Sequence, residues 1–207
     1  MLEDITFIDL KILSLFTKDY LINYSIREMT LKLGLNYSHT FKRINNLVKQ
    51  NILIKHKHGQ ANRITLNIQN LNTVQLISFV EEQESQKLNN PNLKLIAQEA
   101  ILTDPFACIG LFGSRVSGKV SKESDWDVFI ITQKRKEIEK IVSKFPHIEN
   151  IQLQVFSLDE FQESILSTEE TVVKHILRNK QIIYNSHPFY NIIYKWEKIK
   201  NAPSQTN

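Results

Sequence analysis

The chain has 207 residues, of which 42% are hydrophobic and 23% are charged, and its formal net charge is +4. This composition is that of a globular protein with one or two domains, and 5 Gly and 5 Pro exclude collagen-like and low-complexity chains. The N-terminal residues lack the basic and apolar regions of a signal peptide, and no stretch approaches the roughly 18 apolar residues of a membrane span. The single cysteine cannot form an internal disulfide. We therefore expect a cytoplasmic protein that does not enter a membrane.

Charge is unevenly distributed along the chain. Residues 1–68 contain 10 Lys and Arg against 5 Asp and Glu, a net charge of +5, so the remaining residues have a net charge of −1. The segment from Met29 to Ile68 has seven basic residues and no acidic ones. A one-sided surface of this kind is typical of proteins that bind a polyanion, and the alternative is a solvated basic face.

Helical spacing of apolar residues predicts three short helices near the N-terminus, at residues 9–16, 26–33 and 37–50. Asp9 is placed to cap the first helix, and Gly34 suits the C-terminal cap of the second. Two helices joined by a short turn that contains glycine are a candidate helix-turn-helix.

Two β-prone runs follow, at residues 52–55 and 63–68, and the polar turn between them predicts a hairpin. The order of three helices and a hairpin resembles a winged helix-turn-helix domain. The resemblance implies that the third helix is the recognition helix, that the hairpin is the wing and that double-stranded DNA is the partner, although winged helices also act as protein-interaction modules. The residues expected to contact DNA are Ser38, His39, Lys42, Arg43, Asn46, Lys49, Lys55, Lys57 and Arg63.

A helix at residues 71–83 and a polar stretch that contains Pro91 lead out of this region. The predicted organisation is a winged helix-turn-helix domain at 1–70, a connecting helix and linker at 71–92, a second domain at 93–200 and a disordered tail at 201–207. In the second domain we expect helices at 93–102, 134–144, 161–179 and 189–199 and strands at 107–112, 125–131, 150–156 and 181–184.

The motif with the most specific chemistry lies in the second domain, at residues 113–131, and has the sequence GSRVSGKVSKESDWDVFII. If its last seven residues form a strand, side-chain alternation places Asp125 and Asp127 on one face, close enough to share a cation. Beside them, the turn at Gly113 and Ser114 can approach phosphates closely. Two carboxylates and such a turn indicate a site for a Mg²⁺-bound nucleoside triphosphate.

This motif resembles the signature of the DNA polymerase beta-like nucleotidyltransferase superfamily, in particular its minimal members: Gly-Ser, a Gly four residues after that Ser, and Ser-Asp-x-Asp at the start of a strand. The resemblance covers about residues 93–184 and implies an α/β domain with a mixed sheet flanked by helices, so that the whole chain is α+β. It implies that Asp125 and Asp127 are catalytic and hold two Mg²⁺ ions, with an NTP as substrate or ligand. The residues expected to bind the nucleotide are Gly113, Ser114, Arg115, Gly118, Lys119 and Ser124, although Arg115 and Lys119 equally suit a solvated loop.

The third carboxylate that the family has on a later strand has no match in this chain. The outward positions of that strand are Gln152 and Gln154, whose amides carry no charge and cannot act as a base. Glu149, just before the strand, is a weaker substitute, and Glu160 is expected to form a capping box with Ser157.

Two classes of function follow. The first is a Mg²⁺-dependent nucleotidyltransferase that moves a nucleoside monophosphate from an NTP to a hydroxyl of a protein, an RNA or a small molecule. The alternative is a DNA-binding transcriptional regulator whose transferase-like domain is weak or inactive because the third acid is missing. The toxin of a toxin-antitoxin pair is a third class, which an N-terminal DNA-binding domain argues against. A homodimer would suit DNA binding, because helix-turn-helix proteins often bind two half-sites as dimers.

Overall fold

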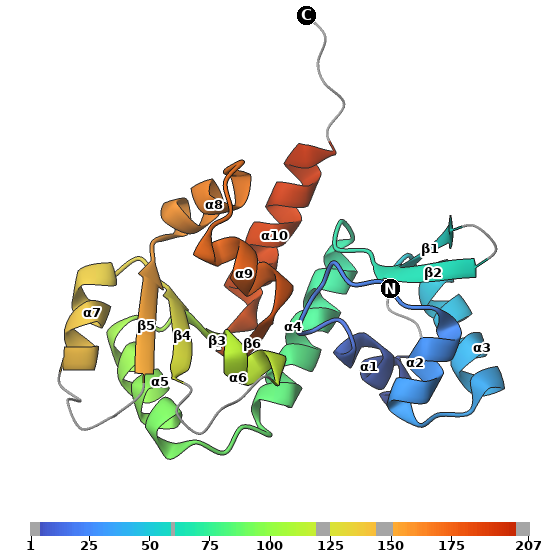
Figure 1. Cartoon of the computed structure of the whole chain (residues 1–207), viewed down its shortest axis with the longest axis horizontal. Coiled ribbons are helices and arrows are strands. Elements are labelled where there is room, and N and C mark those ends of the chain that lie inside the picture. The colour runs from blue at the N-terminus through green and yellow to red at the C-terminus, as the bar shows by residue number, and fades with distance from the viewer. Residues whose placement is uncertain (1–4, 59–60, 119–124, 144–150, 202–207) are drawn as a thin grey trace, which may run out of the picture. The chain divides into compact units, whose positions relative to one another are not determined.

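The computed structural model describes residues 5–58, 61–118, 125–143 and 151–201. The chain forms two compact units, one of residues 1–80 with 193–207 and the other of residues 81–192 (Figure 1). No helix in the described ranges is both long and apolar enough to cross a membrane.

The first unit begins with three helices and a hairpin. Its elements are α1 (Phe7–Ser14), α2 (Ile26–Leu33), α3 (Tyr37–Lys49), β1 (Leu53–His58), β2 (Ala61–Leu66) and the first part of α4 (Leu71–Ser85). The two strands pair antiparallel, with Leu53 opposite Leu66. The predicted helices and hairpin are confirmed, and both strands extend into the segment that was expected to be a turn.

The prediction that Asp9 is the N-cap of α1 is wrong, because Asp9 is the third residue of the helix. The N-cap is Thr6, whose backbone N–H donates to Oδ2 of Asp9 at 2.7 Å. From α3, the Nε of Arg43 donates to Oδ1 of Asp9 at 2.9 Å, and a second guanidinium nitrogen donates to Oδ2. This ion pair links α1 to α3. Because Asp9 is fully buried, loss of Arg43 would leave the charge of Asp9 uncompensated in the interior.

The second unit is a four-stranded mixed sheet with helices on both faces (Figure 1). The strand order is β5-β4-β3-β6, in which β4 and β5 are parallel and the other neighbours are antiparallel. Its elements after α4 are α5 (Pro91–Thr103), β3 (Cys108–Phe112), α6 (Ser114–Ser117), β4 (Trp126–Ile131), α7 (Arg135–Ser143), β5 (Ile151–Phe156), α8 (Leu158–Leu166), α9 (Val172–Arg178), β6 (Lys180–Tyr184) and the first part of α10 (Ser186–Lys200).

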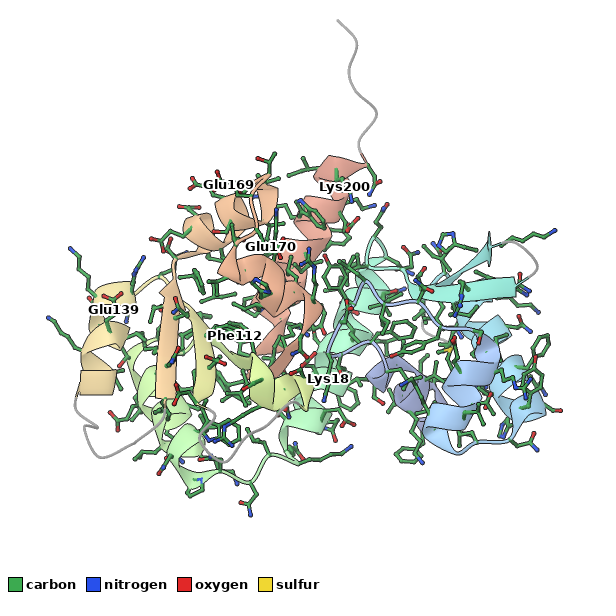
Figure 2. The ribbon with its side chains drawn as sticks, in the orientation of Figure 1. Lys18, Phe112, Glu139, Glu169, Glu170 and Lys200 are labelled. Atoms are coloured by element: carbon green, nitrogen blue, oxygen red, sulfur yellow. The ribbon has the colours of Figure 1, made fainter. Side chains whose placement is uncertain are left out.

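Alternation along the strands gives this sheet two apolar faces. On one face, α5 and α7 pack against aliphatic side chains of the strands, among them Ile109 and Val128. On the other face, the ring of Phe129 lies 6.2 Å from that of Phe189 on α10, which lies 5.9 Å from that of Phe161 on α8. Figure 2 shows the side chains that fill both layers. The sheet is therefore covered by helices on both sides.

The single helix predicted at residues 161–179 is wrong, because the chain forms α8 and α9 there instead. Ser167 ends α8 with an extended backbone (ψ 143°), and the side chain of Thr171 accepts a hydrogen bond from Lys174 N to begin α9. Serine and threonine favour helix ends over helix interiors, since their side chains bond to nearby backbone groups. The ends of the other predicted elements shift by three residues or fewer.

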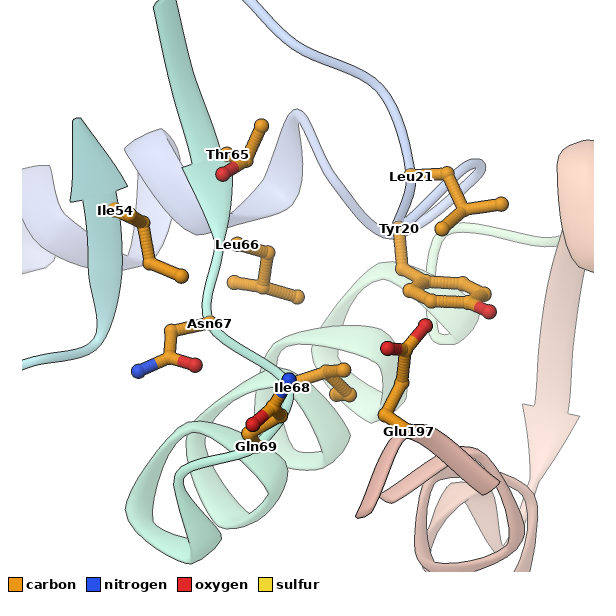
Figure 3. Close-up of a pocket in the computed structure, with 9 residues that line it drawn as sticks. All are labelled: Tyr20, Leu21, Ile54, Thr65, Leu66, Asn67, Ile68, Gln69 and Glu197. Carbon is orange, nitrogen blue, oxygen red and sulfur yellow. The ribbon is translucent and has the colours of Figure 1, made fainter. Parts of the chain in front are cut away.

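The first unit contains a cavity of about 200 Å³ next to the hairpin. Figure 3 shows Tyr20 and Glu197 together at one end of it. The Tyr20 hydroxyl is buried and has no hydrogen-bond partner among the described residues. Burial, with the negative charge of Glu197 as a smaller cause, raises the pKa of Tyr20, so this hydroxyl keeps its proton.

A fully buried ion pair joins the C-terminal part of α4 to β6. Lys180 Nζ lies 2.8 Å from Oε2 of Glu81, and the hydroxyl of Tyr190 donates to the same oxygen at 2.6 Å. The other oxygen, Oε1, accepts the backbone N–H of Ile182 at 2.8 Å. Both Glu81 oxygens are thus satisfied by buried donors, which is what a charge in a protein interior requires.

We expect Glu81→Ala to lower the free energy of unfolding by about 3–5 kcal/mol, because it leaves the Lys180 charge buried and unpaired. Glu84→Ala is the matched control, since Glu84 lies on the same helix and pairs with Lys87 at the surface. Loss of that surface pair should cost less than about 1 kcal/mol. Urea denaturation of the full chain measures both values, and equal losses would contradict the role given to the buried pair.

Candidate functional site

The Gly-Ser turn follows directly after β3 and packs against a carboxylate. Gly113 has φ 77° and ψ −153°, and Ser114 begins the short helix α6. A Cβ at residue 113 would lie 1.9 Å from Oδ2 of Asp127. Only glycine fits here, because both the backbone conformation and the space exclude a side chain.

Two carboxylates lie at the start of β4, as the alternation predicts. Asp125 directly precedes the strand, Asp127 is its second residue, and both are half-buried. Burial and, to a smaller extent, the negative charge of Asp125 raise the pKa of Asp127. The two carboxylates therefore repel each other, and a cation shared between them would relieve that repulsion.

Gln152, one of the two outward glutamines expected on β5, lies beside this pair. The parallel register of β4 and β5 places Gln152 opposite Asp127, and its Nε2 donates to Oδ2 of Asp125 at 2.7 Å. Gln154 lies opposite Phe129 instead. Among the described residues, no group of three or more His, Cys, Asp or Glu side chains could hold a metal ion.

Glu149 and Glu160 are the other acidic residues considered near this strand. Glu149 lies outside the described residues. Glu160 forms the expected capping box, in which its carboxylate accepts the backbone N–H of Ser157 at 2.8 Å, and it also pairs with Arg135. The hydrogen bond from the Ser157 backbone is the main cause that lowers the pKa of Glu160.

Arg115 braces the turn against the start of β4. Its Nε donates to the backbone carbonyl of Asp125 at 3.2 Å, and its guanidinium lies 4.5 Å from the ring centroid of Trp126. Asn179 supports the turn from the other side, since its Nδ2 donates to the carbonyl oxygen of Gly113 at 3.0 Å. Sequence patterns did not indicate Trp126 or Asn179, because their contacts depend on tertiary structure.

The structure thus brings together the expected residues Gly113, Arg115, Asp125 and Asp127. The expected residues Ser114 and Gly118 lie at the start and the C-cap of α6. The expected residues Lys119 and Ser124 lie outside the described part of the chain.

The residues expected to contact DNA lie on α3 and the hairpin of the first unit. Six of them are exposed: Ser38, His39, Lys42, Lys49, Lys55 and Lys57. Asn46 is half-buried. The guanidinium groups of Arg43 and Arg63 are paired with Asp9 and Glu28, respectively.

Comparison with known proteins finds one family model that matches residues of the second unit. Residues 94–188 match the family model described as polymerase beta, nucleotidyltransferase, so this segment forms a nucleotidyltransferase-fold domain. A solved structure entitled "Crystal structure of the toxin-antitoxin with AMP-PNP" is 16% identical, covers 53% of this chain and 90% of its own, and has a TM-score of 0.34. No curated protein matches the chain.

We expect Asp127→Asn to raise the melting temperature in metal-free buffer at neutral pH. The raised pKa means that this carboxyl favours folding when it is protonated, and that this contribution is lost as the pH rises through its folded pKa. The gain should be small, roughly 1–3 °C, because solvent screens a half-exposed carboxylate, and it should shrink as the pH is lowered. Circular dichroism melts measure it, with the exposed Asp159→Asn as control, and a lower melting temperature for Asp127→Asn at neutral pH would contradict the electrostatic argument.

Proposed function

We propose that the second unit binds a Mg²⁺-bound nucleoside triphosphate and transfers its nucleoside monophosphate to a hydroxyl group. The observation that carries this proposal is the packing of the Gly113 turn on the Asp127 carboxylate, with Asp125 beside it. This arrangement places two carboxylates that a divalent cation can share directly beside the turn that begins α6.

The residues present fit a magnesium ion. Asp125 and Asp127 would hold it, since Mg²⁺ in nucleotide sites is usually bound by one or two carboxylates together with the phosphates. The ion would supply stabilisation of the negative charge on the reacting phosphate. Ser114 and the adjacent backbone N–H groups would bind the remaining phosphates, and Arg115 would keep the turn at the start of β4.

In the proposed reaction, the acceptor oxygen bonds to the α-phosphorus and the bond to the β-phosphate oxygen breaks, which releases pyrophosphate. The proton of the acceptor hydroxyl passes to water, because Gln152 cannot accept it. A second candidate function is nucleotide binding without transfer. The Gln152 side chain favours this second function. It bonds to Asp125 as a neutral amide, on the strand where the resemblance implies a third carboxylate.

A labelling experiment distinguishes these functions. Wild-type protein and the Asp125→Asn/Asp127→Asn double variant are incubated with each of the four α-³²P NTPs, Mg²⁺ or Mn²⁺, and host cell extract. We expect label on a protein, an RNA or a metabolite with the wild type and a loss of at least tenfold with the double variant. Equilibrium dialysis with the same NTPs is the companion measurement: binding without labelling supports the second candidate, and equal NTP affinity of the two proteins would sink both.

We further propose that the first unit is a winged helix-turn-helix domain that binds double-stranded DNA. The support is the exposed positive charge of Lys42 and Lys49 on α3 and of Lys55 and Lys57 on β1. Within the part of the chain that the structure describes, none of these four lysines forms an ion pair, whereas Arg43 does. The lysines are therefore available for phosphates, and Arg43 serves the interior of the unit.

We expect Lys42→Ala and Lys49→Ala each to weaken binding to a fluorescent 30-base-pair duplex and to reduce the slope of log K against log salt by about 1, as for one lost phosphate contact. Lys136→Ala is the matched control, because Lys136 is an equally exposed lysine on α7 of the second unit. Fluorescence anisotropy at several salt concentrations gives the slopes. Unchanged slopes for the α3 variants, or the same change for Lys136→Ala, would refute the DNA-binding surface.

A further inference from the structure

The neutral side chain next to the two carboxylates determines how many cations the site can hold. We propose that the site binds a single divalent cation together with the nucleotide, and that Gln152 is the residue that excludes a second one. This inference rests on the proposed function, because it assumes that the site binds a Mg²⁺-bound NTP.

The Gln152 amide is oriented with its nitrogen toward Asp125. An ionised carboxylate has no hydrogen to donate, so the group that faces Oδ2 of Asp125 at 2.7 Å is the amide nitrogen and its N–H, not the amide oxygen. Gln152 therefore presents a donor to Asp125 where a metal ligand would have to present an oxygen. The same hydrogen bond occupies one lone pair of Asp125 Oδ2.

The charge and the ligands of the site suffice for one cation and not for two. One Mg²⁺ ion can be satisfied by two carboxylates, phosphate oxygens and waters. A second ion, about 3.5–4 Å from the first in two-metal sites, would have to share the same two carboxylates against the repulsion of the first ion. It would also lie next to the Gln152 N–H, whose hydrogen carries a partial positive charge, and would gain no negative charge from that residue.

The two glutamines on β5 lie at different distances from the Asp pair. Gln152 lies opposite Asp127, whereas Gln154 lies opposite Phe129, two residues further along the same exposed edge. A carboxylate at residue 152 would be next to the Asp pair, and a carboxylate at residue 154 would not. The chain therefore offers two isosteric Gln→Glu substitutions that add the same charge to the same strand and differ only in distance from the site.

The experiment counts bound cations in the full-length protein by Mn²⁺ electron paramagnetic resonance. Each of the four α,β-methylene nucleoside triphosphates is used as the non-reactive nucleotide, with protein in excess and a protein-free blank. We expect one Mn²⁺ per bound nucleotide for the wild type and for Gln154→Glu. We expect two for Gln152→Glu, with Gln152→Asp as the second variant if circular dichroism shows that the first is unfolded.

The outcomes separate this inference from the proposed function. Nucleotide binding with two Mn²⁺ ions in the wild type overturns the single-cation site and leaves the proposed function intact. One Mn²⁺ ion in every folded variant overturns the role of Gln152. Absence of nucleotide binding in equilibrium dialysis, with any of the four analogues and Mn²⁺ present, overturns the proposed function and this inference with it.

Discussion

The candidate site depends on a single row of residues that crosses all four strands of the sheet. Gln152, Asp127, Phe112 and Lys180 lie opposite one another on β5, β4, β3 and β6. At the β6 end of this row, Lys180 is fixed by its buried ion pair with Glu81, and at the β5 end Gln152 is exposed. A slip of one residue in β5, β4 or β6 would move the polar side chain of that strand to the opposite face. The buried ion pair is the most costly of these interactions to break, so it keeps β6 in register with β3 next to the Gly-Ser turn.

Local patterns predicted the elements and the position of the two carboxylates well, because those features depend on residues close in sequence. Alternation from Asp125 to Ile131 predicted both the strand and the shared position of the two carboxylates. Contacts between distant residues were not predictable. Asn179 supports Gly113 from 66 positions away, and nothing in the sequence around either residue indicates that hydrogen bond. The break between α8 and α9 was missed because apolar periodicity on both sides concealed the caps at Ser167 and Thr171.

The count of charges in the basic segment was correct, but its interpretation needed the fold. Between Met29 and Ile68 there is no acidic residue, yet Arg43 and Arg63 are paired with Asp9 and Glu28, which both lie before the segment. A local count assigns every cation of a segment to its surface, whereas folding brings carboxylates from elsewhere to some of them. The exposed lysines remain, and they define a smaller and more specific surface than the sequence alone suggested.

The Gln152 amide also affects the site when no cation is bound. Asp125 and Asp127 already repel each other, and burial adds to the cost of ionising Asp127. A third carboxylate on β5 would increase that cost, whereas Gln152 is neutral and donates a hydrogen bond to Asp125. The glutamine therefore adds no further repulsion to the metal-free site, and it also brings no charge that would hold another cation. A site of this kind retains the carboxylates that a nucleotide-bound ion needs and lacks the charge that would attract another.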